Sequence, residues 1–492
     1  MKLFALLAWS GILSAQVIGH SRWGSVLVLE LEGQKKAEIE WVSSSGVRVR
    51  LVASSEPRLT SAVVPFTVTD GPLAITAKTR DLMLEIAKKP LGIRFISGAA
   101  EAVDFQWAAD GVAEFKMTAA ESFYGLGART DARMNVRGHR IRTDQPLLLS
   151  SRGYGVHFPL PGIYDFDIGR SKPELLRVRS DSLAFYFYFT GEPKSVLEQH
   201  HERQRDVFEF TRADVSGVLE AKPEWAFRLP GGKEGRNALI NGSMSGLLVP
   251  AVPVTDPLSA LMPVVLADGE AEFSPDARAQ RKLFETHFLT YVQEARDRGI
   301  PVVHPLALQF PLDPSIASRT DEFMLGDELL VATAKEVYLP QGYWTEWKSG
   351  VQHRGRRAIR LNNSDPWTLF ARNGTIVPID RAFGIELHYF PKLGAEYFIV
   401  EPELGLLTQV HAGPSAEALR LEIEEKTGRE YEWVIYHVSR PVKVMRGDAP
   451  VPSDSWSYDE RTRLLRIRTR AEAADDVIVN VTFEKENWYF AP

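Results

Sequence analysis

Alternation of apolar and polar residues over short segments is the feature that most limits the folds open to this chain. Residues 26–32 and 47–51 alternate with the period of two that buries one face of a β-strand. Residues 184–189 (AFYFYF) are aromatic-rich and too short for a helix, which predicts a strand buried on both faces. Turn residues separate such segments at short intervals, so a β-sandwich is predicted for the N-terminal part.

One amphipathic helix interrupts this β pattern. Ser274 is a suitable N-cap, Pro275 fits the first helical turn, and Asp276 complements the helix dipole. Gly299 and Pro301 are expected to end the helix. Between these signals one apolar face recurs at helical spacing, made of Phe284, Phe288, Tyr291, Val292 and Ala295.

The β pattern returns directly after this helix, at residues 302–303, and continues to the end of the chain. Residues 465–468 and 477–481 are typical of its alternating runs. No internal repeat and no low-complexity linker separates the segments. The predicted fold class is therefore α+β and β-rich, with a short mixed stretch between two β-rich parts.

Length and composition bound the class of protein. A chain of 492 residues has room for about three domains. With 44% hydrophobic and 25% charged residues, a soluble globular protein is expected. The 58 basic and 64 acidic residues are well mixed, so nucleic acid is excluded as a partner and a neutral substrate such as a sugar is compatible. The absence of cysteine excludes disulfides and thiolate chemistry.

The first residues have the pattern of an export signal. Lys2 precedes a short apolar run, and a small residue, Ala15, stands at a suitable cleavage point. A buried first strand and a membrane anchor are the alternatives, but the run is too short to span a bilayer. Residues 1–16 are therefore predicted to be a bacterial-type signal peptide of a secreted or periplasmic protein without a membrane span.

Four ordered stretches carry a more specific signature. The most specific combines residues 299–306 (GIPVVHPL) with 321–331 (DEFMLGDELLV). The others are residues 121–127 with 137–138 and 146–156, residues 164–166 with 191–197, and residues 337–344 with 372–378. Together they resemble glycoside hydrolase family 31, the α-glucosidase and α-xylosidase family. Ala128 departs from the pattern, because an acidic residue is common there.

The resemblance implies an order of domains. A galactose-mutarotase-like N-terminal β-sandwich is expected at residues 17–200, followed by a (β/α) barrel. Proximal and distal C-terminal β-sandwich domains are expected at residues 316–395 and 396–492. The barrel would occupy residues 201–315, and a full barrel takes about 250 residues. Only about a hundred residues separate Leu197 from Pro301, so an incomplete barrel remnant is predicted.

The chemistry of the family also looks incomplete in this sequence. Retaining glycosidases need two carboxyl groups about 5 Å apart, one as nucleophile and one as acid/base. Asp256 is similar in position to a family aspartate, but no glycine pair follows it. The arginine and histidine that the family implies near residues 263–267 are missing, and His304 stands where an arginine is usual.

Few residues could substitute for this machinery. Asp206 begins an Asp-x-x-Glu string that resembles the nucleophile motif, but it precedes any recognisable barrel strand, so a charged linker or helix is the alternative. Asp144 lies in a segment that resembles a sugar-contacting loop, and an exposed turn aspartate is its alternative. The pair His200 and His201 is interpreted as a solvated helix end, because adjacent residues rarely share a metal ion. No metal or cofactor is predicted.

Three functional hypotheses remain open at this point. The chain could be an α-glycosidase acting on α-linked glucosides or xylosides, a non-catalytic carbohydrate-binding or scaffold protein, or a deletion product that folds only in its β domains. Loss of both carboxylates would remove the chemistry, so inactivity is the expectation. Missing strands would also expose sheet edges. Residues 208–219, a flanking sandwich or a second subunit of a homo-oligomer could cover them.

Overall fold

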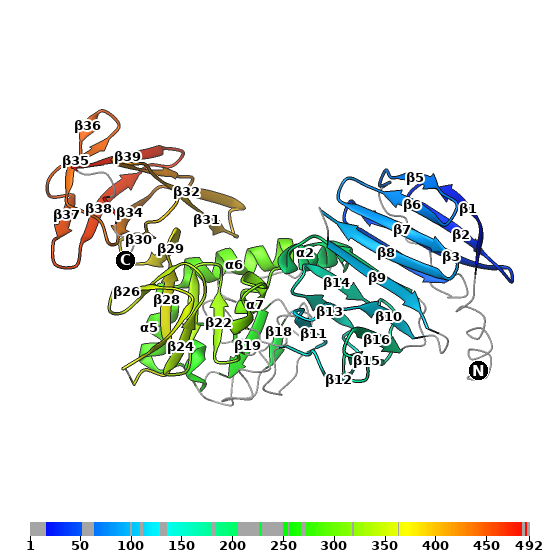
Figure 1. Cartoon of the computed structure of the whole chain (residues 1–492). Helices are drawn as coiled ribbons and strands as arrows, with labels where there is room; N and C mark the ends of the chain where they lie inside the picture. The colour runs from blue at the N-terminus through cyan, green and yellow to red at the C-terminus, as the bar shows by residue number, and fades with distance from the viewer. Residues whose placement is uncertain are drawn as a thin grey trace.

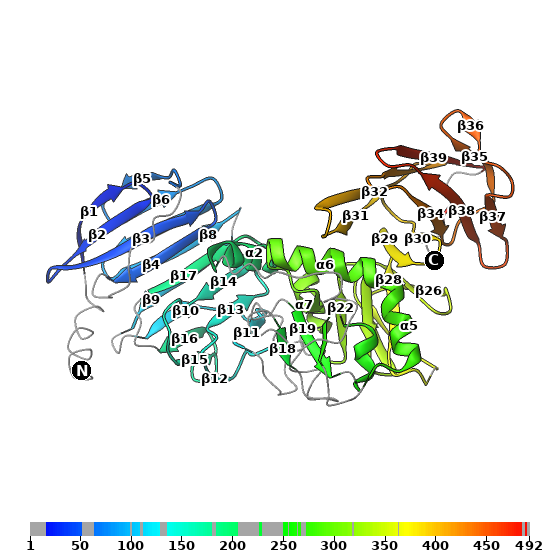
Figure 2. The ribbon, with the colours of Figure 1, turned by 180° about the vertical axis from the view of Figure 1, so that it is seen from behind.

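The computed structural model describes residues 16–51, 63–98, 101–108, 112–127, 135–179, 184–204, 226–228, 249–253, 255–262, 264–266, 272–316, 319–362, 364–484 and 488–489. Within these residues the chain is β-rich, and its strands form seven sheets. Two double-sheet parts lie at opposite ends of an elongated molecule (Figures 1 and 2). No helix in the described part of the chain is long and apolar enough to cross a membrane.

The N-terminal part consists of two large sheets around one hydrophobic core. The first is ordered β1 (Val17–Trp23), β2 (Val26–Leu31), β3 (Lys35–Ser43), β4 (Gly46–Leu51), β17 (Ala184–Phe189), β14 (Tyr154–His157), β13 (Leu147–Ser150) and β11 (Phe123–Gly125). The second is ordered β12 (Arg140–Thr143), β15 (Tyr164–Ile168), β16 (Leu175–Arg179), β10 (Ala113–Lys116), β9 (Glu101–Trp107), β8 (Leu91–Ser97), β7 (Leu82–Lys88), β6 (Ala74–Lys78) and β5 (Thr67–Asp70). All pairings within these two sheets are antiparallel.

The centre of the first sheet is buried on both faces. Strand β17 is buried at all six positions, as its aromatic composition predicts. Strand β4 is also buried throughout, which corrects the expectation of one buried and one exposed face. Its polar residues are buried because they pair with β3: Arg50 Nε donates to Glu38 Oε2 at 2.7 Å, and the guanidinium of Arg48 lies 3.5 Å from Glu40.

Helix α2 (Pro193–Gln204) connects this part to the middle of the molecule. It packs on β13, β14 and β17 and lies beside helix α6 (Glu285–Arg298), as Figures 1 and 2 both show. Arg298 Nε donates to Glu198 Oε1 at 2.7 Å, and His201 Nε2 lies 2.8 Å from the backbone oxygen of Arg296. The N-terminal sheets and the central helices are therefore fastened by hydrogen bonds as well as by apolar contact.

A small sheet with parallel pairing occupies the middle of the molecule. It contains β18 (Ala226–Arg228), β19 (Val249–Pro253) and β20 (Val264–Leu266), each parallel to its neighbour. The 3-10 helix η1 (Pro257–Ala260) follows β19, and helix α5 (Pro275–Leu283) precedes α6. Parallel strands followed by helices are typical of α/β units, which agrees with the mixed stretch predicted here.

The single predicted helix is in fact two. Ser274 caps α5 by accepting a hydrogen bond from Ala277 N, and Gly299 ends α6 in a left-handed conformation, both as predicted. At Phe284 the chain leaves helical geometry, and Phe284 N bonds to Arg281 O. The N–H of Thr286 is directed to the carboxylate of Asp380, 94 positions further along the chain, instead of to the preceding helical turn.

The C-terminal part begins with a six-stranded sheet, ordered β21 (Val303–Pro305), β22 (Glu322–Leu325), β23 (Leu329–Ala332), β28 (Thr368–Arg372), β25 (Tyr343–Glu346) and β26 (Gln352–Arg354). Strands β24 (Glu336–Leu339) and β27 (Arg357–Arg360) pair separately. Helix α7 (Leu306–Gln309) and the 3-10 helix η2 (Pro314–Ile316) connect β21 to β22. All pairings in these two sheets are antiparallel.

Two further sheets share a core at the end of the chain. One is ordered β29 (Thr375–Asp380), β30 (Gly384–Phe390), β34 (Arg429–Ile435), β38 (Leu464–Ala471) and β37 (Trp456–Asp459). The other is ordered β31 (Ala395–Glu401), β32 (Leu406–Pro414), β33 (Ala418–Glu424), β39 (Asp476–Phe483), β35 (Pro441–Arg446) and β36 (Ala449–Pro450). The predicted boundary between residues 395 and 396 falls at the start of β31, whereas the chain enters this double sheet at β29.

Candidate functional site

The ends of the parallel strands are where the resemblance places the chemistry of the protein. Asp256 lies three residues beyond β19 and is the only acidic residue among residues 249–253, 255–262 and 264–266 of that sheet and its connections. Its Oδ1 accepts a hydrogen bond from Leu258 N at 2.9 Å and so caps η1. A carboxylate in this role satisfies a free backbone N–H at the start of a helix. Asp256 is therefore a structural cap in this conformation.

The two predicted site residues are not brought together by the described structure. Asp206 lies outside the described residues. Asp144 is exposed in the turn between β12 and β13, next to Thr143, whose hydroxyl accepts a hydrogen bond from Gln145 N at 2.9 Å. This exposed position is compatible with both interpretations of Asp144, a turn residue and a contact for a sugar.

His304, at the position where an arginine is usual in the family, is fully buried in β21. Its Nδ1 lies 2.9 Å from Pro301 O, and its Nε2 lies 3.9 Å from Asp327 Oδ1. Burial lowers the pKa of His304 to about 4, and the nearby Lys194 ammonium contributes to this shift. His304 is therefore neutral near pH 7. It packs as an uncharged side chain beside an ion pair.

That ion pair joins Asp327 to Lys194 of helix α2. Burial alone would raise the pKa of Asp327, but the charge of Lys194 and the hydrogen bond from its ammonium lower it below its ordinary value. Asp327 lies in the turn between β22 and β23, in one of the motif stretches. The pair thus fastens this turn to the helix that leaves the N-terminal sheets, and it is an ionised structural contact.

Tyr291 and Glu328 form a second buried polar contact next to this turn. The Tyr291 hydroxyl donates to Glu328 Oε2 at 2.5 Å and accepts a hydrogen bond from Asp327 N at 2.9 Å. Burial raises the pKa of Glu328 to about 8, and the charge of Asp327 adds to this effect. A raised pKa is typical of a catalytic acid. Glu328, however, is buried within the core between α6 and β23, so we assign it a structural role.

The adjacent histidines of α2 also have structural contacts. The ring of His200 packs against His157 of β14 with centroids 4.5 Å apart, and His201 reaches the backbone of Arg296. The predicted solvated helix end is therefore wrong, because both side chains are partly buried between α2 and its neighbours. Among the residues that the structure describes, no group of three or more His, Asp or Glu side chains is placed to hold a metal ion.

Comparisons with known proteins identify the C-terminal part most directly. Residues 299–377 match the glycosyl hydrolase family 31 C-terminal domain. An isomaltosyltransferase from Sporosarcina globispora is 34% identical over 94 residues, which cover 18% of this chain and 9% of the relative. Neutral alpha-glucosidase AB from Mus musculus is 36% identical over 130 residues, which cover 24% of this chain and 13% of the relative. The matched segments thus span a small fraction of these curated relatives.

Solved structures resemble the chain over a much longer range. A family 31 dextranase from Flavobacterium johnsoniae, complexed with isomaltotriose, aligns over 96% of this chain and 100% of its own with a TM-score of 0.77 at 13% identity. The cycloalternan-forming enzyme from Listeria monocytogenes, in complex with a pentasaccharide substrate, aligns over 95% of this chain and 77% of its own with a TM-score of 0.79 at 13% identity. Identity this low shows a shared fold only. Residues 299–377 are thus similar to the C-terminal domain of glycosyl hydrolase family 31, and the chain shares its overall fold with solved structures of that family.

Proposed function

We propose that this protein recognises α-linked glucosides or xylosides without hydrolysing them. The observation that carries the proposal is the short connection between α2 and β21. About a hundred residues span this interval, whereas a full barrel takes about 250. In the described part of the interval, three parallel strands are present, and the one acidic residue that follows them at close range, Asp256, caps a helix.

The chemistry of retaining hydrolysis supports the same proposal. Two carboxyl groups about 5 Å apart must face the glycosidic bond. Of the described carboxyl groups next to the central helices, Asp327 is paired with Lys194 and Glu328 is buried against Tyr291. Neither is placed to act as nucleophile or acid on a bound sugar. Asp206 remains the candidate nucleophile of the alternative hypothesis, an active α-glycosidase.

We further propose the following organisation of the protein. Residues 1–16 are a signal peptide of a secreted or periplasmic protein, and residues 17–200 form the N-terminal sandwich. Residues 201–315 form a reduced barrel, and residues 316–395 and 396–492 form the two C-terminal units. The antiparallel pairing of β21 with β22 supports a reduced barrel, because the last strand of a closed barrel has parallel neighbours on both sides.

A paired measurement of turnover and binding tests this function. We expect no release of chromophore from 4-nitrophenyl α-glucoside or α-xyloside, together with measurable binding of isomaltotriose by calorimetry. Turnover that disappears in Asp206→Asn and persists in Asp144→Asn would establish the hydrolase instead. Binding that weakens in Asp144→Asn would assign the sugar contact to this turn.

The scaffold alternative has its own expected result. A scaffold would neither turn over nor bind isomaltotriose, and it would remain folded and monodisperse. A deletion product would aggregate, because exposed strand edges pair with other chains. Size-exclusion chromatography with light scattering separates these outcomes. It also tests whether a second subunit covers the central sheet in a homo-oligomer.

A further inference from the structure

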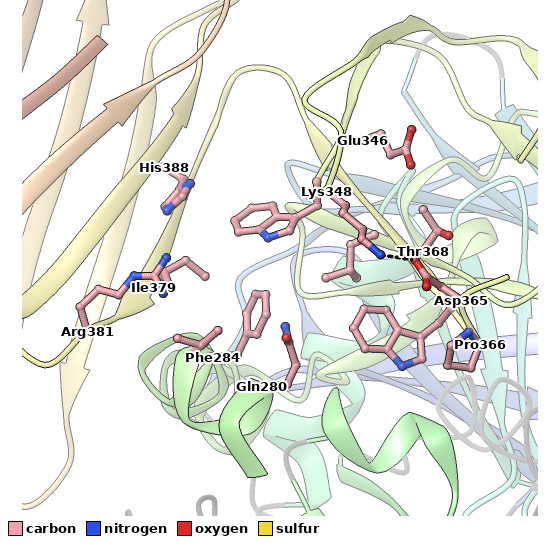
Figure 3. A pocket seen from close by; sticks show the side chains of 14 residues that line it. Gln280, Phe284, Glu346, Lys348, Asp365, Pro366, Thr368, Ile379, Arg381 and His388 are labelled. Carbon is pink, nitrogen blue, oxygen red and sulfur yellow. Dashed lines mark hydrogen bonds and ion pairs between the residues drawn. The ribbon is translucent and has the colours of Figure 1, made fainter. Parts of the chain in front are cut away.

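A cavity of about 440 Å³ lies where three elements of the C-terminal half meet. The end of helix α5 and Phe284 form one side, β25 and β28 of the six-stranded sheet with their adjoining residues form the second, and β29 and β30 form the third (Figure 3). Small-molecule sites commonly have volumes of about 300–1,000 Å³ and lie at junctions between domains. The cavity lies next to η1, because its lining residue Trp367 donates a hydrogen bond to Pro257 O.

Aromatic rings give this cavity a fixed apolar surface. Trp347 is held between Phe284 and His388, with ring centroids 5.9 Å and 5.0 Å away. Trp367 is oriented by a hydrogen bond from its Nε1 to Pro257 O at 3.2 Å. Both tryptophans are partly exposed and line the cavity. Flat rings that are already immobilised can bind the C–H face of a sugar ring at a small conformational cost.

The charges around the cavity balance, which favours a neutral ligand. Lys348 Nζ donates to Asp365 Oδ2 at 2.9 Å within the lining, as Figure 3 shows. Arg381 is paired at 2.7 Å with Glu386, which lies behind the cavity wall. Burial lowers the pKa of His388, so this ring is uncharged near pH 7 although Glu386 acts in the opposite direction. An anionic ligand would therefore find the cations Lys348 and Arg381 already neutralised by carboxylates, so its charge would gain little.

Two polar side chains in the lining, Gln280 and Glu346, can form further hydrogen bonds, which makes a purely apolar ligand unfavourable. The side-chain amide of Gln280 projects from α5 beside Phe284 (Figure 3) and forms no hydrogen bond with another described residue. Within the same described set, the Glu346 carboxylate accepts one hydrogen bond, from Ser349 Oγ at 2.8 Å. An apolar ligand would bury the Gln280 amide without a partner and the Glu346 carboxylate with only one, which is unfavourable. Hydroxyl groups would satisfy them, since they both donate and accept.

We propose that this cavity is a saccharide-binding site that takes a neutral pyranose unit, stacked on Trp347 or Trp367 and hydrogen-bonded to Gln280 and Glu346. This inference rests on the proposed function, carbohydrate recognition, and it names the site that performs it. It places recognition at the junction of α5 with the C-terminal sheets.

Calorimetry with isomaltotriose on four proteins tests the site: the wild type, Trp367→Ala, Gln280→Ala and the control Trp23→Ala. Trp23 is a strongly exposed tryptophan of the N-terminal sheets, with 72% of its surface accessible. We expect about tenfold weaker binding for Trp367→Ala, about threefold weaker binding for Gln280→Ala and unchanged binding for Trp23→Ala, as lost stacking and hydrogen bonding predict. Gln280→Ala keeps the test valid if the tryptophan substitution disturbs folding.

The possible failures are distinguishable. If the wild type binds isomaltotriose and both cavity variants bind it equally well, the cavity proposal is overturned and carbohydrate recognition stands. If the wild type binds no neutral saccharide, the proposed function fails together with the site. Glucuronic acid supplies a charge control, because equal or tighter binding of this anion at the cavity would contradict the neutral ligand.

Discussion

The carboxylate of Asp380 accepts two hydrogen bonds from Thr286, one from the backbone N–H at 2.8 Å and one from the hydroxyl at 2.7 Å. Asp380 is the last residue of β29, and Thr286 is the second residue of α6. Helix α6 has no side-chain cap of its own at Phe284. A distant strand therefore supplies the cap and ties the C-terminal double sheet to the central helices.

Removal of this cap should destabilise the protein. For Asp380→Ala we expect a decrease in the free energy of unfolding of about 1–2 kcal/mol, the usual effect of losing a helix N-cap. Denaturant unfolding followed by circular dichroism measures it. Asp448→Ala is the matched control, because Asp448 is an exposed aspartate in the turn between β35 and β36. Equal stability of the two variants would mean that the cap contributes nothing.

Arg281 should be a second determinant of stability, because it binds the segment that connects β19 to β20. This guanidinium is 3% exposed and donates to Ser259 O at 2.9 Å and to Met262 O. Burial lowers the pKa of Arg281 to about 10, so it stays charged near pH 7. Arg281→Met would leave buried carbonyl groups without a partner, and we expect a loss of about 2–4 kcal/mol.

Arg278 provides the control on the same helix. It is exposed and pairs with Glu272 at 3.2 Å, a surface contact worth no more than about 1 kcal/mol. Thermal unfolding of Arg278→Met and Arg281→Met compares the two. Limited proteolysis should also cut the Arg281→Met protein near η1 before it cuts the wild type. A larger effect at Arg278 would contradict the assignment.

Much of the fold could be predicted from local sequence patterns. The alternation at residues 465–468 lies in β38, the aromatic run at 184–189 is β17, and Gly299 ends a helix. These features depend on residues close together in the chain. The failed predictions depend on distant residues. At the break in the helix, the backbone N–H of Thr286 donates to the distant Asp380. The arginines of β4 can be buried because Glu38 and Glu40 of β3 neutralise their charges.

The proposed saccharide site illustrates the same limit. Gln280, Trp347 and Trp367 lie far apart in the sequence, and no spacing between them predicts that they line one cavity. A weak signal was present, because each tryptophan lies within two residues of a carboxylate, Glu346 or Asp365. Such pairs are common on ordinary surfaces. Only the packing of α5 against two sheets makes them one cavity.

Gly326 should tolerate no side chain. Its φ is +63°, and an added Cβ would lie 2.3 Å from Cε2 of Tyr291. We expect Gly326→Ala to lower the free energy of unfolding by about 2–4 kcal/mol through backbone strain and overpacking together. Gly350 has a similar φ of +69° with nothing within 4 Å of its added Cβ. Gly350→Ala should therefore lower the free energy of unfolding only through backbone strain, by about 1 kcal/mol. Chemical denaturation of both variants separates backbone strain from overpacking.

Buried titratable groups should give the protein a stability maximum near neutral pH. Burial lowers the pKa of His200, His287, His304 and His437 to about 4. Between pH 4 and about 6.5 the unfolded chain binds more of these protons, so stability rises with pH. Burial raises the pKa of Glu322 and Glu328 from 4.5 to about 8, so between these values the folded chain binds more of their protons. The four histidines outweigh this effect up to about pH 6.5, and above that pH the stability falls.

Glu328→Gln tests the alkaline side of this profile. The amide oxygen can still accept the Tyr291 hydrogen bond, but it carries no charge at any pH. In the wild type, the Glu328 proton is retained up to about pH 8 in the folded state and released near pH 4.5 in the unfolded state. The penalty for its ionisation thus accumulates between these values, at about 1.4 kcal/mol per pH unit for one proton. We expect the variant to equal the wild type near pH 4.5 and to exceed its stability by about 2–5 kcal/mol at pH 8.

Denaturant titrations at pH 5, 6.5 and 8, with exposed Glu417→Gln as the control, measure this difference. A stability difference between Glu328→Gln and wild type that stays constant across these pH values would show that Glu328 is not protonated in the folded core.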